Sequence, residues 1–121
     1  MAQHYKDLVA WQKAMDLVVE VYKISDCFPR REIYSLADQI RRAAVSVPSN
    51  IAEGQAHFNR GEFLHFLRHA SGSLAEIETQ MLIAQRLDYV SEAQAKGMLE
   101  HVHEVGRILS GLIASINKPA A

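Results

Sequence analysis

Residues 46–54 read Ser-Val-Pro-Ser-Asn-Ile-Ala-Glu-Gly, and they place a proline inside a run whose apolar spacing is otherwise that of one amphipathic helix. Pro48 removes one backbone donor, and its ring clashes with the carbonyl of Ala44. We therefore expect the helix to kink there, at a cost of roughly 3 kcal/mol unless packing compensates. The short polar residues of the same run can bond the freed carbonyl or allow another helix to approach closely.

Apolar residues recur at mixed spacings of three and four in four blocks of the chain, and no block alternates with the period of two that marks a strand. The blocks consist of Leu8, Trp11, Met15, Val18 and Tyr22; of Ile33, Leu36, Ile40, Ala43, Ala44, Val47 and Ile51; of Phe63, Leu67, Ala70, Leu74, Ile77 and Met81; and of Met98, Val102, Val105, Leu109, Leu112 and Ile116. Short connections between long helices favour antiparallel neighbours. The sequence therefore predicts an all-α fold, an antiparallel up-down-up-down four-helix bundle with a proline-kinked second helix.

Residues typical of helix ends separate these blocks. They are Phe28-Pro29 after the first helix, Gly54 as a C-terminal cap of the second, Asn59 with Glu62 before the third, and Ser91 with Gln94 as a capping box before the fourth.

Composition bounds the class of protein. The 121 residues fit a single domain over residues 1–121, and 49% hydrophobic with 22% charged residues is typical of a globular chain rather than a disordered one. A net charge of −1 favours no class of partner. The single cysteine, Cys27, suits a reducing compartment. The sequence shows no apolar run long enough for a membrane span and no signal peptide, so we expect a cytoplasmic protein without a membrane partner.

The first helix carries a second apolar stripe beside the block already given. This stripe consists of Ala10, Ala14, Leu17, Val21 and Ile24. Together the two stripes cover roughly 220° of the helix, where an isolated bundle needs little more than 100°. We expect the excess to form an oligomer interface through Ala14, Leu17 and Val21, with the short side chains of Ser46 and Ser49 on the second helix. The alternatives are a wider intramolecular core for the first helix and a solvated face for the second.

Several motifs resemble the 23S rRNA-intervening-sequence protein family over about residues 5 to 90. They are Trp11-Gln12-Lys13-Ala14, Phe28-Pro29 with Glu32 and Tyr34, Gln39 to Ala44, residues 46–54, and Phe63-Leu64 with residues 73–78. The resemblance implies a four-helix bundle that assembles into a ring, typically a homopentamer, encoded in some bacteria within insertions in the large-subunit rRNA gene. The accessory proteins of diversity-generating retroelements look like the same ring. The resemblance thus implies RNA or DNA, and a reverse transcriptase, as candidate partners.

Basic residues on or beside the second helix are the candidate nucleic-acid contacts. They are Arg30, Arg31, Arg41, Arg42 and Arg60. Phosphate binding needs several cations at one surface, and a ring would repeat each of them. Asp38 lies three and four residues before Arg41 and Arg42, however, so a face of intrahelical ion pairs is the alternative. Tyr34 is near Arg31 and can stack on a base, or it can pack at a helix end.

Metal-binding and catalytic patterns are weak. Glu62 and His65 form one Glu-x-x-His pair where a di-iron bundle needs two, and His65 with His69 is expected to point outward. No nucleophile with a base and an orienting group is visible. We expect no enzyme, no metal, no cofactor and no small-molecule substrate. Two hypotheses remain, a ring-forming nucleic-acid-binding accessory protein and an oligomeric protein-protein scaffold without a nucleic-acid role.

Overall fold

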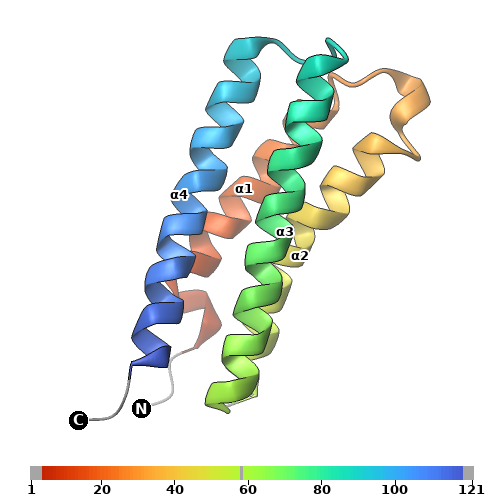
Figure 1. The fold of residues 1–121 in the computed structure, drawn as a ribbon. Helices are drawn as coiled ribbons and strands as arrows, with labels where there is room; N and C mark the ends of the chain where they lie inside the picture. Colours follow the sequence, from red (N-terminus) through yellow and green to blue (C-terminus); the bar gives the residue numbers. More distant parts are fainter. Residues whose placement is uncertain (1–3, 58, 119–121) are drawn as a thin grey trace.

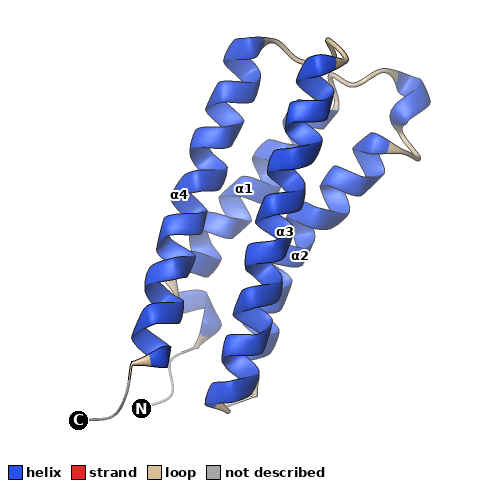
Figure 2. Ribbon diagram, viewed as in Figure 1, coloured by secondary structure: helices blue, strands red, loops and turns tan. Residues whose placement is uncertain are grey.

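All regular secondary structure in the part that the computed structural model describes, residues 4–57 and 59–118, is helical, and no strand lies in these ranges (Figure 2). In chain order the elements are η1 (Tyr5–Asp7), α1 (Val9–Ser25), η2 (Arg30–Glu32), α2 (Leu36–Ala56), α3 (Arg60–Arg86) and α4 (Glu92–Asn117), where η denotes a short 3-10 helix. The predicted all-α fold is confirmed.

Side-chain caps fix the starts of the two longest helices. The Asn59 side chain accepts a hydrogen bond from the backbone N–H of Glu62 at 2.9 Å at the start of α3. At the start of α4, Ser91 and Gln94 exchange hydrogen bonds between side chain and backbone at 2.8 and 3.1 Å. Both caps satisfy N–H groups that have no partner inside the helix. The two predicted starts are therefore confirmed.

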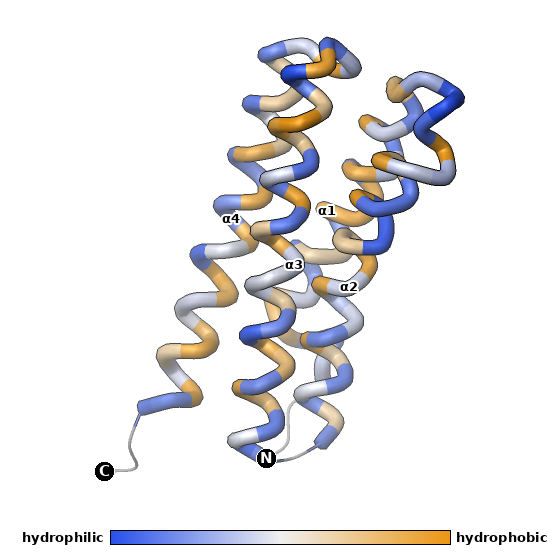
Figure 3. The backbone as a smooth tube through the Cα atoms, turned by 45° about the vertical axis from the view of Figure 1, so that its right-hand side comes forward, coloured by the Kyte–Doolittle hydropathy of each residue, from blue (hydrophilic) through white to orange (hydrophobic). Residues whose placement is uncertain are grey.

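The four long helices enclose one hydrophobic core. Each packs on its neighbour in the sequence, and α1 also packs on α4, as in a four-helix bundle. Figure 1 shows the start of α1 and the end of α4 at one end of the bundle, with the connection between α1 and α2 standing out at the other. Hydrophobic positions recur along every helix in Figure 3. The largest fully buried side chains are Leu17, Ile40, Ile51, Leu67, Ile77, Met81, Met98, Leu109, Val21, Val47 and Val105.

The oligomer interface expected at the second stripe of α1 is wrong, and the alternative, a wider intramolecular core, is what the structure shows. Ala14, Leu17 and Val21 are fully buried within this one chain, so they form its core and not an oligomer interface. Of the stripe expected to face the core, Leu8 is buried and Trp11 and Val18 pack against the core, whereas Met15 and Tyr22 are more than 40% exposed. The alanines of the buried stripe allow neighbouring helices to pack close to α1, which the bulkier stripe does not.

The C-terminal cap predicted at Gly54 is also wrong. Helix α2 continues to Ala56 and is capped by His57, and no glycine in the described residues has a positive φ. Gly54 lies instead where α2 crosses α3. A Cβ atom built on Gly54 meets the Cβ of Phe66 at 2.7 Å and Cδ1 of Phe63 at 3.1 Å. The residue is glycine because the helices approach too closely for a side chain.

Helix α2 runs through Pro48 without interruption, and the bend expected there stays a prediction. The neighbouring polar residues bond between helices and along α2. Ser46 Oγ is 2.8 Å from Ser73 Oγ of α3, and the Asn50 side-chain amide donates to the Ser46 carbonyl at 2.8 Å. Ser46 is thus engaged inside the chain rather than free for an oligomer interface, whereas Ser49 is exposed.

Candidate functional site

The connection between α1 and α2, residues 26–35, carries Tyr34, the most exposed large hydrophobic side chain of the described residues, and we refer to this connection as the tip. Tyr34 is 92% exposed and Ile33 is 49% exposed, and Arg30 and Arg31 are exposed beside them. Ile33 was expected in the second helix. Because α2 begins only at Leu36, Ile33 lies on the tip, where its side chain is exposed.

Aromatic packing and hydrogen bonds attach the tip to the bundle. Phe28 is buried and its ring lies 5.8 Å from that of Tyr89, which precedes α4. The Tyr89 hydroxyl donates to Glu32 Oε2 at 2.7 Å, and Glu32 Oε1 accepts the backbone N–H of Leu36 at 3.2 Å. Glu32 therefore joins the tip both to the start of α2 and to the connection between α3 and α4.

These bonds shift the ionisation of both partners. The hydrogen bond from Tyr89, followed by that from Leu36 N–H, lowers the pKa of Glu32 below its ordinary value of 4.5. The same bond to Glu32 raises the pKa of Tyr89 above its ordinary value of 10.0. At neutral pH the pair is therefore a carboxylate with a neutral phenol as its donor.

Two neighbouring hollows run from the tip along the seam between α1 and α2, and arginines line both. The first, of about 310 Å³, is lined by Arg30 and Arg41 among others. The second, of about 530 Å³, is lined by Arg41 and Arg42 together with Tyr22 and Val45. Three of the five predicted basic residues are thus brought together on one side of the bundle.

Arg41 is the fixed member of this group. Its Nε donates to Ser25 Oγ at 2.7 Å, its Nη2 donates to Asp26 Oδ1 at 2.8 Å, and its guanidinium lies 5.0 Å from the centre of the Tyr22 ring. Only 23% of the side chain is exposed. Arg41 therefore acts first as a structural clamp between α1 and α2.

Arg42 is more available. Its Nε donates to Asp38 Oδ2 at 2.8 Å, the intrahelical pair that the spacing predicts, but 80% of the side chain is exposed. Both Nη groups lack a hydrogen-bond partner in residues 4–57 and 59–118. An arginine held at Nε presents its remaining donors in a fixed orientation, which suits a phosphate.

The other two predicted arginines lie apart. The Arg31 guanidinium is 5.8 Å from the centre of the Tyr89 ring, on the side of the tip that faces the start of α4. Arg60 begins α3, and its Nη2 donates to the Lys118 carbonyl at 3.1 Å at the opposite end of the bundle. The 21 residues of α2 span about 30 Å, so Arg60 shares no surface with the tip.

A second polar seam separates α2 from α3. Two hollows of about 380 and 440 Å³ share Ser46, Ser73 and Glu76. One also contains Arg42 and Gln80, whose Oε1 is buried without a hydrogen-bond partner in the described residues. The Ser46–Ser73 hydrogen bond joins α2 to α3 across this seam.

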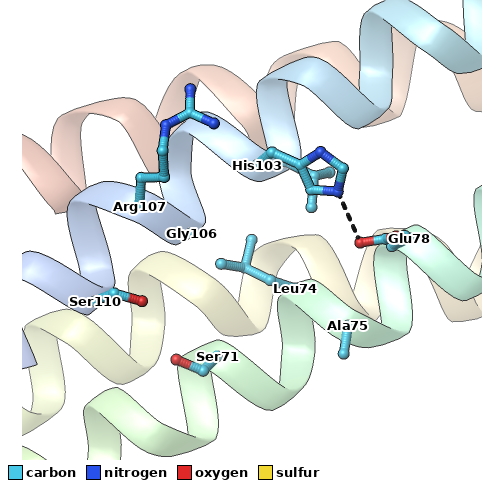
Figure 4. Close-up of a pocket in the computed structure, with 9 residues that line it drawn as sticks. Ser71, Leu74, Ala75, Glu78, His103, Gly106, Arg107 and Ser110 are labelled. Carbon is cyan, nitrogen blue, oxygen red and sulfur yellow. Dashed lines mark hydrogen bonds and ion pairs between the residues drawn. The ribbon is translucent and has the colours of Figure 1, made fainter.

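Another hollow, of about 590 Å³, lies between α3 and α4 and has an apolar floor (Figure 4). His103 Nε2 and Glu78 Oε1 are 3.1 Å apart at one end, a pair that could orient a general base. Figure 4 shows the hydroxyls of Ser71 and Ser110 at the other end, with Leu74 between them and His103. The hollow therefore does not place either of these hydroxyls beside the histidine as a nucleophile.

The remaining candidates are surface features. His65 and His69 are exposed, with ring centres 4.5 Å apart, as expected for outward-facing positions on α3. No group of three or more potential metal ligands occurs in the described part of the chain. None of its helices has the length and hydrophobicity that a membrane span requires.

The supporting residues of the tip were not found from the sequence. Tyr89 and Glu32 are 57 positions apart, and no local sequence pattern predicts the hydrogen bond between them. Both lie just outside long helices, where apolar periodicity carries no information. Only the bundle geometry brings them together.

Comparison with known proteins gives a family and a fold. A family model described as 23S rRNA-intervening sequence protein matches residues 6–111. The chain is also similar to a solved structure, a protein with unknown function from the S23 ribosomal protein family of Bacteroides thetaiotaomicron VPI-5482. The two share 21% identity with a TM-score of 0.80, and the match covers 87% of this chain and 98% of that one. No curated protein matches the chain.

Proposed function

We propose that this chain, which belongs to the 23S rRNA-intervening sequence protein family, is a non-enzymatic, self-assembling helical bundle that binds nucleic acid through the tip and the adjacent arginines of α2. Its assembly is proposed to be a ring, with five subunits as the expected number. The resemblance to retroelement accessory proteins, and a reverse transcriptase as partner, stay predictions.

The observation that carries the proposal is the alignment of Arg30, Arg41 and Arg42 along two adjoining hollows. Arg30 is exposed, and Arg42 keeps both Nη groups available while Asp38 orients it. The two hollows contain the carboxylates of Asp26 and Asp38 against the three guanidinium groups of Arg30, Arg41 and Arg42. When arginines neutralise the phosphates of a nucleic acid, the counterions around those phosphates are released, which favours binding. An assembly that repeats this surface would release more counterions and bind more tightly.

Self-assembly is supported by exposed apolar side chains on α1 and α2. Met15, Val19 and Tyr22 are 41%, 54% and 43% exposed, and Val45 of α2 is 41% exposed. Tyr22 and Val45 line the hollow that holds Arg41 and Arg42, so we place the contact between copies at Met15 and Val19 of α1 and leave that hollow to the nucleic acid. Exposed apolar side chains that lie together on a small chain favour an interaction site. The second copy would cover Met15 and Val19 and not the buried residues first expected.

The test is a titration with fluorescein-labelled single-stranded RNA and duplex DNA at several salt concentrations, starting near 50 mM, where phosphate contacts are strong. We expect binding of unrelated sequences with similar affinity. The log-log salt slope should be near −0.7 per phosphate neutralised on single strands and −0.9 on duplex. The double variant Arg30→Gln/Arg42→Gln should bind more weakly and with a shallower slope.

Arg60→Gln/Arg107→Gln is the matched control, because it removes the same charge from surfaces away from the tip. Arg60 lies at the opposite end of the bundle, and Arg107 lines the hollow between α3 and α4. It should leave affinity close to that of the wild type. If both double variants weaken binding equally, the effect belongs to total charge and not to this surface. If the wild type binds neither nucleic acid near 50 mM salt, the proposed function is wrong.

A second candidate function is a protein-protein scaffold without a nucleic-acid role. One observation favours it, namely that Arg41 and Arg42 already have carboxylate partners in Asp26 and Asp38. In that case the arginines hold α1 and α2 together, and the exposed apolar stripe is the functional surface. The same titration separates the two functions.

A further inference from the structure

We infer that Tyr34 is a stacking platform for an unpaired base, so that the ligand of the tip is single-stranded nucleic acid rather than duplex. This inference rests on the proposed function and names its substrate class. It starts from an exposed fraction of 92%, against at most 55% for any other large hydrophobic side chain in the described residues. Tyrosine is intermediate in its tendency to be buried in folded proteins, so a ring exposed to this extent is available for a ligand.

The tip presents this ring from a fixed backbone. Backbone hydrogen bonds run from Ile33 N–H to the Arg30 carbonyl at 3.1 Å and from Ser35 N–H to the Glu32 carbonyl at 3.0 Å. Glu32 is itself held by Tyr89 and Leu36. The loop on either side of Tyr34 is thus ordered before any ligand arrives, which lowers the entropic cost of binding through it.

The neighbours of Tyr34 supply the remaining chemistry of a single-strand site. Such sites combine aromatic faces for the bases with cations along the backbone, and they tolerate any sequence because every base has a π-face. Arg30 and Arg31 are exposed on the same loop, and the hollow that begins at Arg30 leads on to Arg41. In a duplex the bases are stacked on one another, so a projecting tyrosine has no face to meet.

Figure 1 shows the connection between α1 and α2 extending to one side of the bundle, and Tyr34 on it is 92% exposed. A strand can therefore follow the arginines while one base stacks on Tyr34. The alternative occupant of an exposed aromatic is a second copy of the chain, and the experiment distinguishes the two.

The experiment measures binding of labelled oligo(U) RNA, oligo(dT) DNA and a mixed-sequence duplex, each about 12 nucleotides long, a length within the range of known single-strand sites. Tyr34→Ala should lower the affinity for both single strands by about 5- to 150-fold, the range expected for loss of one stacked base. Tyr34→Phe, which keeps the ring, should bind as the wild type does. The salt slope should be unchanged in both variants, because no phosphate contact is lost.

Duplex affinity should be the same for Tyr34→Ala and the wild type. If the wild type binds single strands and Tyr34→Ala binds them equally well, Tyr34 is not a stacking residue, while the proposed function stands. If the wild type binds none of the three nucleic acids, the proposed function is wrong, and the inference that rests on it is wrong as well. A changed mass of Tyr34→Ala in light scattering would place Tyr34 in a contact between copies and would overturn the inference.

Discussion

Gly54 shows how one residue can be recognised for the wrong reason. Glycine near the end of a helix is most often a cap, but here it permits the contact of α2 with Phe63 and Phe66 of α3. The sequence around Gly54 does not reveal that α3 packs against this residue. Residues 46–54 therefore indicate the family correctly but led to a wrong prediction of where α2 ends.

Gly54→Ala should lower the free energy of unfolding by about 1–3 kcal/mol, because the added Cβ overlaps the backbone-attached Cβ of Phe66. This loss should appear although alanine is the better helix former by about 1 kcal/mol. Gly72→Ala is the control, since a Cβ there meets nothing within 4 Å, and it should raise stability by up to about 1 kcal/mol. Equal effects of the two changes in denaturant titrations would contradict the packing role.

The bond between Glu32 and Tyr89 makes stability depend on pH. Because the pKa of Glu32 in the folded chain is lowered below 4.5, its contribution is complete above pH 4.5 and is lost as the pH falls through the lowered value. The pKa of Tyr89 is raised above 10.0, so its contribution is complete below pH 10.0 and is lost as the pH rises through the raised value.

Tyr89→Phe should therefore be less stable than the wild type at pH 7, and the difference should shrink in acid near pH 3, below the ordinary value for glutamate. The measurement is the free energy of unfolding of both proteins at the two pH values. A difference that is the same at both would show that the hydroxyl does not act through the carboxylate.

At the scale of elements, the two stripes of α1 explain what apolar periodicity can and cannot predict. The spacing identified the helices and most of the core of α2, α3 and α4, because only one face of each is strongly apolar. On α1 both faces are apolar, and spacing alone cannot choose between Leu17 and Met15. Packing decides, since the face with Ala10 and Ala14 allows the closer approach.

Substitutions on the two faces of α1 should therefore behave differently. Leu17→Glu places a charge in the core and should unfold the chain. Met15→Glu/Val19→Glu changes exposed side chains and should dissociate the assembly while helical circular dichroism is kept. Leu82→Glu, at a similarly exposed site on α3, is the control and should leave the assembly intact. Dissociation by Leu82→Glu alone would place the subunit contact on α3.

The predicted bend of α2 at Pro48 also belongs to the scale of elements. We expect Pro48→Ala to straighten α2 and weaken assembly, even though alanine is the better helix former by about 3 kcal/mol. Light scattering with denaturant titration tests this. A variant that is more stable and assembles normally would show that the bend has no role.

For the whole molecule, the proposal requires several copies of the tip in one particle. Light scattering should give a mass several times the 13.6 kDa of the chain, and five times for a pentameric ring. The proposed contact between copies is the exposed apolar surface of α1 around Met15 and Val19. A monodisperse monomer at tens of micromolar, where a micromolar interface is mostly occupied, would end the ring model.

The most direct test of the central claim is a map of the nucleic-acid contact by ultraviolet crosslinking of the assembled protein to 4-thiouridine-containing single-stranded RNA, read by mass spectrometry. Our account predicts crosslinks on the tip, at Tyr34 and its neighbours within residues 26–35, that disappear when unlabelled RNA competes. Crosslinks confined to the end of the bundle that carries Arg60, or none above the level of a non-binding control protein, would contradict it.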